Sequence, residues 1–197
     1  MVQLLIVANV VVFLAEIFAG DALIRTFALW PLVASAGDGN GVFMPWQPLT
    51  YAFLHANGAH LVLNMFGLYM FGRDVERTLG ALRAWLLYVS SILSAALAQI
   101  VCTALGFLPA APVIGASGGV FGLLLAYCVL FPHRTVILLI PPIPMPAWLL
   151  ATLYAIVELV LGVSRTQGNV AHFAHLGGMV GSGLMLWHWL HGPARES

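Results

Sequence analysis

Charge is scarce in this sequence, and lysine is absent from it altogether. Charged residues make up 7% of the 197 positions and hydrophobic residues 61%. A soluble domain carries about 25% charged residues. The mean hydropathy of +0.99 points the same way. We therefore expect a protein whose main solvent is lipid, and the lack of any basic patch excludes nucleic acid as a partner.

Long apolar runs dominate what is present. Lipid tolerates only helices or closed barrels, and a barrel needs short segments of alternating polarity that this sequence lacks. Spanning a bilayer takes about 20 apolar residues, and six segments qualify: about 2–20, 59–79, 84–107, 113–131, 147–163 and 170–191. The sequence thus predicts an all-α membrane protein, a bundle of six transmembrane helices in a single domain over 1–197, with a long structured loop at 21–58.

Arginine positions predict the orientation, because cytoplasmic loops are enriched in basic residues. With six spans, most arginines fall on the same side as the N-terminus: Arg73, Arg77, Arg83, Arg134 and Arg195. We expect both termini to be cytoplasmic, in a multi-pass protein of a bacterial plasma membrane. Cys102 and Cys128 lie inside apolar runs, so no disulfide is predicted.

Polar side chains gather near the start of alternate spans. The second span carries His60 and Asn64, the fourth begins near Ser117, and the sixth carries His175. In the predicted topology these spans enter from the same face, so the polar groups share one shallow layer. Pairs of small residues four apart let membrane helices approach closely. Such pairs follow the polar groups in the fourth and sixth spans: Gly118 and Gly122, Gly177 and Gly181, and Gly178 and Ser182.

These residue types suit acyl transfer. A serine hydroxyl becomes a good nucleophile when an adjacent base takes its proton, and histidine is suited to that task. The Ser117 backbone N–H, His60 and the Asn64 amide can supply donors for the oxyanion, and Phe121 is placed to stack on His175. Glu158 shows no partner in the sequence, so we predict a Ser117–His175 dyad that needs no metal and no cofactor.

The chain resembles the rhomboid family of intramembrane serine proteases over nearly its whole length. The resemblance rests on Trp46-Gln47, His60-x-x-x-Asn64, Gly115-x-Ser117-Gly118 and Ala174-His175-x-x-Gly178. It implies Ser117 and His175 as the catalytic pair and His60 and Asn64 as oxyanion residues, in a cavity that opens outward. It also implies a gate and cap formed by the fifth span and the 164–171 loop, and single-span membrane proteins as substrates. Gln47 stands where many members have arginine.

Other functions are less compatible with the residues. A transporter would be favoured by inverted repeats, a metalloprotease by His-Glu-x-x-His, and an aspartyl protease by aspartates inside two spans, and none of these features is found. The main alternative is a catalytically inactive relative that acts in binding or trafficking, although this chain keeps both the serine and the histidine. His172 and His188 are interpreted as hydrogen-bonded bundle residues and His55 as an interfacial one. The sequence does not indicate an oligomeric state.

Overall fold

The structure, a computed structural model, describes residues 1–32, 41–137, 142–164 and 171–191. It is helical apart from one short ribbon of two strands. The helices are α1 (Val2–Ala19), α2 (Asp21–Phe27), α3 (Gln47–Thr50), the 3₁₀ turn η1 (Tyr51–Phe53), α4 (Gly58–Gly67), the π-helical turn η2 (Leu68–Gly72), α5 (Arg73–Leu79), α6 (Ala81–Ala104), α7 (Ser117–Leu130), α8 (Ala147–Ser164) and α9 (His172–His191). The strands β1 (Thr135–Ile137) and β2 (Pro144–Pro146) pair antiparallel.

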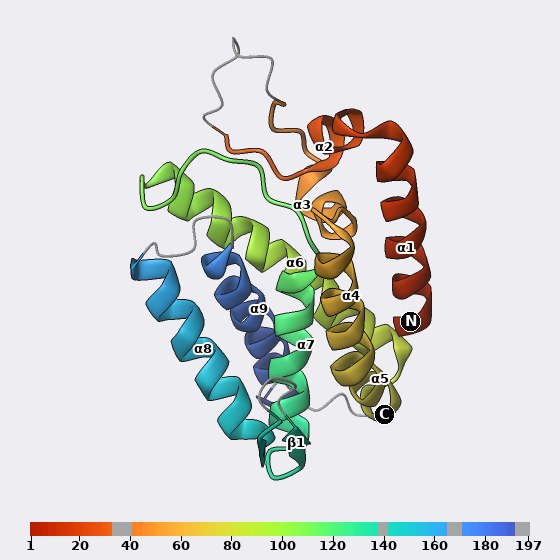
Figure 1. Cartoon of the computed structure of the whole chain (residues 1–197). Helices are drawn as coiled ribbons and strands as arrows, with labels where there is room; N and C mark the ends of the chain where they lie inside the picture. Colours follow the sequence, from red (N-terminus) through yellow and green to blue (C-terminus); the bar gives the residue numbers. More distant parts are fainter. Residues whose placement is uncertain (33–40, 138–141, 165–170, 192–197) are drawn as a thin grey trace.

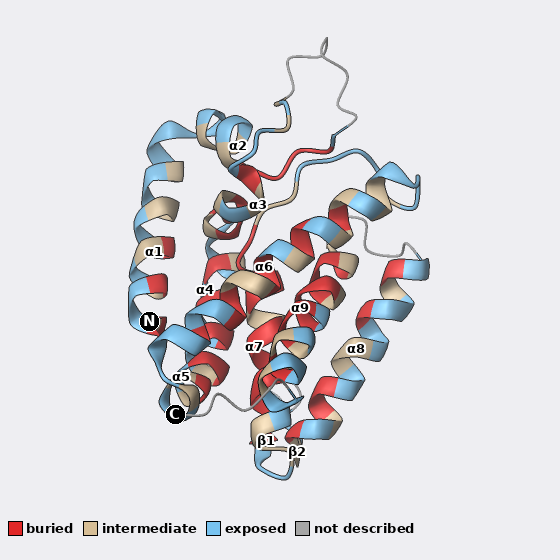
Figure 2. Ribbon diagram, turned by 180° about the vertical axis from the view of Figure 1, so that it is seen from behind, coloured by how far each residue is buried: buried red, intermediate tan, exposed pale blue. Residues whose placement is uncertain are grey.

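The helices α7 and α9 form the centre of the bundle, with α4, α6 and α8 around them and α1 at one side (Figure 1). Burial is densest on α7 and α9, whereas α1 and α8 are largely exposed (Figure 2). Within the described residues, α1, α6 and α8 are long and apolar enough to cross a membrane. The predicted all-α membrane fold is confirmed, and the number of six spans stays a prediction.

Of two predicted spans, the second agrees with the helices observed and the fourth begins later than predicted. The second span, predicted over 59–79, is a continuous run of α4, η2 and α5 in which one turn widens to π geometry. The fourth, predicted over 113–131, becomes helical only at Ser117, because Gly115 has a φ of 128°, outside the helical region. Val113 there forms a β-bridge with Leu29, which ties this segment to the long loop. As a result, Ser117 sits at the first turn of a helix.

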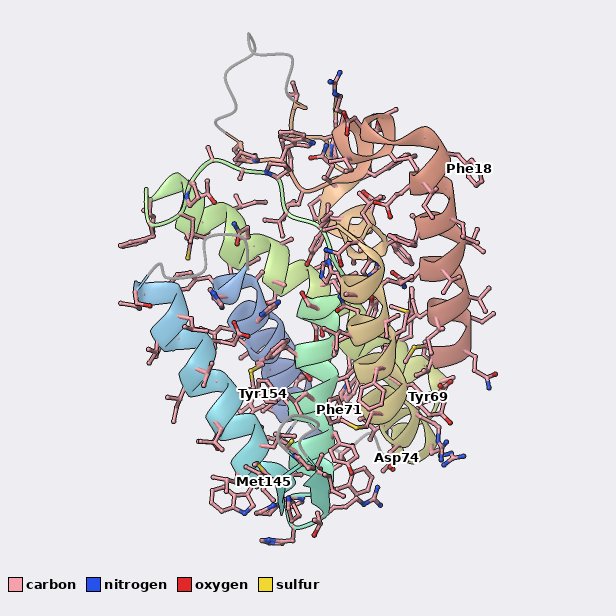
Figure 3. The ribbon with its side chains drawn as sticks, viewed as in Figure 1. Phe18, Tyr69, Phe71, Asp74, Met145 and Tyr154 are labelled. Atoms are coloured by element: carbon pink, nitrogen blue, oxygen red, sulfur yellow. The ribbon has the colours of Figure 1, made fainter. Side chains whose placement is uncertain are left out.

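The outer faces of the peripheral helices carry exposed apolar side chains. On α1, Phe18 is 89% exposed and points away from the bundle (Figure 3). On α8, Ile156, Val160 and Val163 are likewise exposed. Such surfaces are costly in water and favourable against lipid tails, so these faces are where the protein meets the membrane.

Glycines set the spacing of the central helices. A Cβ on Gly178 of α9 would lie 2.0 Å from the Gly118 carbonyl oxygen of α7, so the two backbones touch. Gly177 and Gly181 face another helix: added Cβ atoms there would meet Ala98 and Ser90 of α6. The close crossing of the fourth and sixth predicted spans is therefore present, but we were wrong to group Gly177 and Gly181 with it.

The long loop is anchored by the neutral side chain of Gln47. Gln47 is fully buried, and its side-chain amide donates to the carbonyls of Val42 and Thr26 while its oxygen accepts from the Trp30 backbone. The Trp46 indole also donates to Thr26. A neutral side chain can thus hold this loop beside the helices.

The opposite end of the bundle is held by charge. Arg134, after α7, forms an ion pair of 2.6 Å with Asp74 of α5. Figure 3 places Asp74 at the same end as Met145 of the β ribbon. Ser117 and His175 lie away from this end, where α7 and α9 begin (Figure 1).

Candidate active site

Ser117 and His175 meet where α7 and α9 begin. The Oγ of Ser117 lies 2.7 Å from Nε2 of His175, a hydrogen-bond distance. Ser117 is the first residue of α7 and partly accessible, whereas His175 is buried in the first turn of α9. The contact expected between these two side chains is present, and its length suits transfer of the hydroxyl proton to the ring.

The imidazole of His175 is positioned by stacking on an aromatic ring. Phe121, one turn below Ser117 on α7, stacks on it with ring centroids 4.4 Å apart and an interplanar angle of 7°. Tyr154 of α8 in turn packs edge-on against Phe121, with ring centroids 5.7 Å apart. Figure 3 shows Tyr154 between α8 and the central helices. The ring plane of His175 is consequently fixed by residues from two helices.

His60 approaches the serine from α4. A Cβ built on Gly115 would lie 2.9 Å from His60 Nε2 and 3.7 Å from Ser117 Oγ, so this imidazole edge is next to the hydroxyl. Gly115 also has a φ of 128°, so only glycine suits the position. The Nδ1 of His60 accepts from the Ala56 backbone N–H at 3.3 Å. In the neutral ring Nε2 then carries the proton and is free to donate toward the serine.

Asn64 lies one turn below His60 and is buried. Its Nδ2 donates to the His60 carbonyl at 2.9 Å, which leaves the second N–H of the amide for another acceptor. The backbone N–H of Ser117 is a third donor, since the first N–H groups of a helix lack intrahelical partners. The α4 face that carries His60 and Asn64 and the first turn of α7 thus each offer a hydrogen-bond donor.

An acidic residue that the sequence analysis left without a partner joins the site. One oxygen of Glu158, Oε2, lies 2.6 Å from Nδ1 of His172 and 3.0 Å from Nδ1 of His175. All three side chains are buried. The expectation that no carboxylate reaches the pair was wrong. A signal was available, because Glu158 falls on the inward stripe of α8 with Leu150, Ala151, Tyr154 and Gly162.

The same three side chains are the one group among the described residues whose ligand atoms could hold a metal ion. Glu158, His172 and His175 each offer an atom, all within 4.8 Å of one another. The two short contacts already satisfy the carboxylate with imidazole nitrogens. The expected hydrogen-bonded role of His172 agrees with this, whereas His188 is exposed near the end of α9. The predicted 164–171 cap lies outside the described residues except for its two ends.

Fold and site together define an all-α membrane protein with a serine–histidine pair at one end of its central helices. The family model described as "Rhomboid domain" matches residues 43–192. The chain therefore belongs to the rhomboid family.

Individual relatives agree with the family match. The chain is 34% identical over 138 residues to "Rhomboid protein 1, mitochondrial" of Saccharomyces cerevisiae, covering 70% of this chain and 40% of that protein. It is 31% identical over 145 residues to "RHOMBOID-like protein 12, mitochondrial" of Arabidopsis thaliana, covering 66% and 42%. Identity to "Rhomboid protease GluP" of Bacillus subtilis is 30% over 174 residues, covering 86% and 30%. The chain thus spans less than half the length of these relatives.

Proposed function

We propose that this protein is an intramembrane serine endopeptidase that cleaves single-span membrane proteins. The observation that carries the proposal is the 2.7 Å contact between Ser117 Oγ and His175 Nε2. The similarity to a protein named as a rhomboid protease supports the same chemistry. An inactive relative with a role in binding or trafficking is the alternative, and retention of a serine–histidine contact in hydrogen-bond geometry favours the protease.

In the proposed reaction His175 takes the hydroxyl proton as Ser117 Oγ attacks the scissile carbonyl carbon. The oxyanion accepts hydrogen bonds from the Ser117 backbone N–H, His60 Nε2 and the Asn64 amide. His175 then gives the proton to the leaving amine, and water hydrolyses the acyl-enzyme with the ring again acting as base. No metal or cofactor enters these steps. We propose cytoplasmic termini, which place this layer near the outer face of a plasma membrane.

The test is labelling of the purified protein with a fluorophosphonate, together with cleavage of a membrane-tethered reporter. We expect labelling and cleavage by the wild type and neither by Ser117→Ala or His175→Ala, with all three proteins showing helical circular dichroism. Cleavage by Ser117→Ala at the wild-type rate would refute the assignment of the nucleophile. A folded wild type that neither labels nor cleaves would favour the inactive alternative.

A further inference from the structure

The carboxylate of Glu158 is a buried ionisable group that the proposed reaction leaves unused. Glu158 lies on the inner face of α8 and is buried. The opposite face of α8 is exposed and apolar. Ionisable residues at such positions are costly and usually serve a function. The side chain faces α9 and brings Oε2 to within 3.0 Å of His175 Nδ1, on the ring edge opposite the atom that contacts Ser117.

We propose that Glu158 is a positioning residue that completes a Ser117–His175–Glu158 triad, an inference that rests on the proposed function. For His175 to accept the serine proton at Nε2, the neutral ring must carry its own proton on Nδ1. An acceptor beside Nδ1 favours that tautomer and stabilises the imidazolium that forms during attack. Among the described residues, Oε2 is the carboxylate oxygen that occupies this place.

The contact is close but not ideally directed. The 3.0 Å distance suits an ion pair, while the Nδ1–H direction falls outside hydrogen-bond geometry in this resting state. Catalytic hydrogen bonds are often poorly aligned before substrate binds and tighten as charge develops. His172 holds the same oxygen at 2.6 Å and so restrains the carboxylate near the ring. His172 therefore restrains Glu158, and its own ring also lies edge-on to that of His175 with centroids 6.5 Å apart.

The other groups around His175 leave Glu158 as its one anionic neighbour in the described part of the chain. The titratable side chains that face it are His172 on α9, His60 on α4 and, beyond Phe121, Tyr154 on α8. The α6 residues that meet α9 beside it, such as Ser94 and Ala98, are uncharged. Among these neighbours, only Glu158 can offer a carboxylate oxygen to His175 Nδ1.

A bound metal is the competing explanation of this cluster, and the distances favour the triad. Zinc ligands lie about 2.0–2.2 Å from the ion, which separates neighbouring tetrahedral ligand atoms by more than 3 Å. Here Oε2 is 2.6 and 3.0 Å from the two Nδ1 atoms. These are direct contacts between an acceptor and ring nitrogens, with too little space for an ion between them.

The experiment compares the rate of fluorophosphonate labelling in the wild type and Glu158→Gln. The rate should fall by at least about tenfold, since loss of the acid from complete triads costs about 10⁴-fold. Glu158→Asp keeps a carboxylate and should lose less of the rate than Glu158→Gln. Leu159→Ala, on the exposed side of the same turn, should match the wild type.

A second measurement keeps the inference separate from the proposed function. In ¹⁵N-histidine NMR, the His175 signal, assigned by its loss in His175→Gln, should report Nδ1–H in the wild type and a changed tautomer balance in Glu158→Gln. That result would support the Glu158–His175 contact even if the wild type failed to label. Failure of the wild type to label would contradict only the proposed protease function. An unchanged tautomer together with an unchanged labelling rate in Glu158→Gln would overturn the triad. The triad would also be overturned if EDTA changed the labelling rate of the wild type but not that of Glu158→Gln. The Glu158–His172–His175 cluster would then be a metal site.

Discussion

The backbone contact between α7 and α9 at Gly118 and Gly178 offers a sharp test of how helix spacing controls the site. In Gly178→Ala the new methyl group would lie 2.0 Å from the Gly118 carbonyl oxygen. This falls short of the 3.4 Å of ordinary contact by about 1.4 Å. The neighbour is backbone on a central helix and cannot rotate away. The helices α7 and α9 must therefore separate.

The separation acts directly on the reacting pair, because Gly178 lies one turn after His175 and Gly118 follows Ser117. Half of the shortfall, about 0.7 Å, would lengthen the 2.7 Å contact beyond the roughly 3.2 Å limit of a good hydrogen bond. A misplacement of about 1 Å can cost about 10²-fold in rate. Overpacking should also destabilise the fold by about 1–3 kcal/mol.

The assay is the second-order rate of fluorophosphonate labelling, with thermal unfolding in detergent measured alongside it. Gly183→Ala is the matched control on the same helix, because its Cβ would meet only the flexible end of Leu125 at 3.3 Å. We expect about a 10²-fold loss for Gly178→Ala and little change for Gly183→Ala. Equal labelling rates and melting temperatures in the two variants would refute the link between helix spacing and the site.

Two further predictions concern α4 and the residues before it. Asn64→Ala should lower the cleavage rate of a membrane-tethered reporter by about 10²-fold, since one oxyanion donor is worth about 3 kcal/mol, and an unchanged rate would remove Asn64 from the oxyanion site. His55, expected at the interface, is instead buried, and burial, with a smaller effect of His60, lowers its pKa to about 4. The unfolded chain then binds the proton more readily than the folded protein, so stability should fall as the pH drops from about 6.5 toward 4. The melting temperatures of the wild type and His55→Phe should diverge in that window. Parallel plots of melting temperature against pH would contradict the lowered pKa of His55.

Patterns along the sequence predicted the helices more reliably than their ends. Lipid forces long apolar segments into helices, so composition alone indicated the fold class. The start of α7 was misplaced because Val113–Ala116 is as apolar as the helix that follows. Val113 and Gly115 are kept out of the helix by tertiary contacts, namely the Leu29–Val113 bridge and the hydrogen bond from the Gly115 N–H to the Tyr51 carbonyl. Neither contact is visible in local hydropathy.

The candidate site was predictable where a motif or a pair of small residues marked a helix face, and it was missed at Glu158, where no such pattern stands beside the residue. The His60–Asn64 spacing and the Ser117–Phe121 spacing each define a helix face, and both faces point inward. Glu158 stands alone on α8 in the sequence, and its partners appear only when α8 is placed against α9. Gly162 permits that placement, because a Cβ there would meet the His172 Cβ at 3.2 Å.

The position of Glu158 also links stability to the proposed chemistry. A carboxylate on a helix with a lipid-facing surface is tolerated when its charge is paired and hydrogen-bonded. His172 and His175 provide that pairing, and both lie at the start of α9. The contact between Glu158 Oε2 and His175 Nδ1 thus has two effects. It stabilises the buried carboxylate, and it places an acceptor beside Nδ1 of the proposed base. Because Glu158 belongs to α8 and His175 to α9, the orientation of the ring depends on how these two helices are packed together.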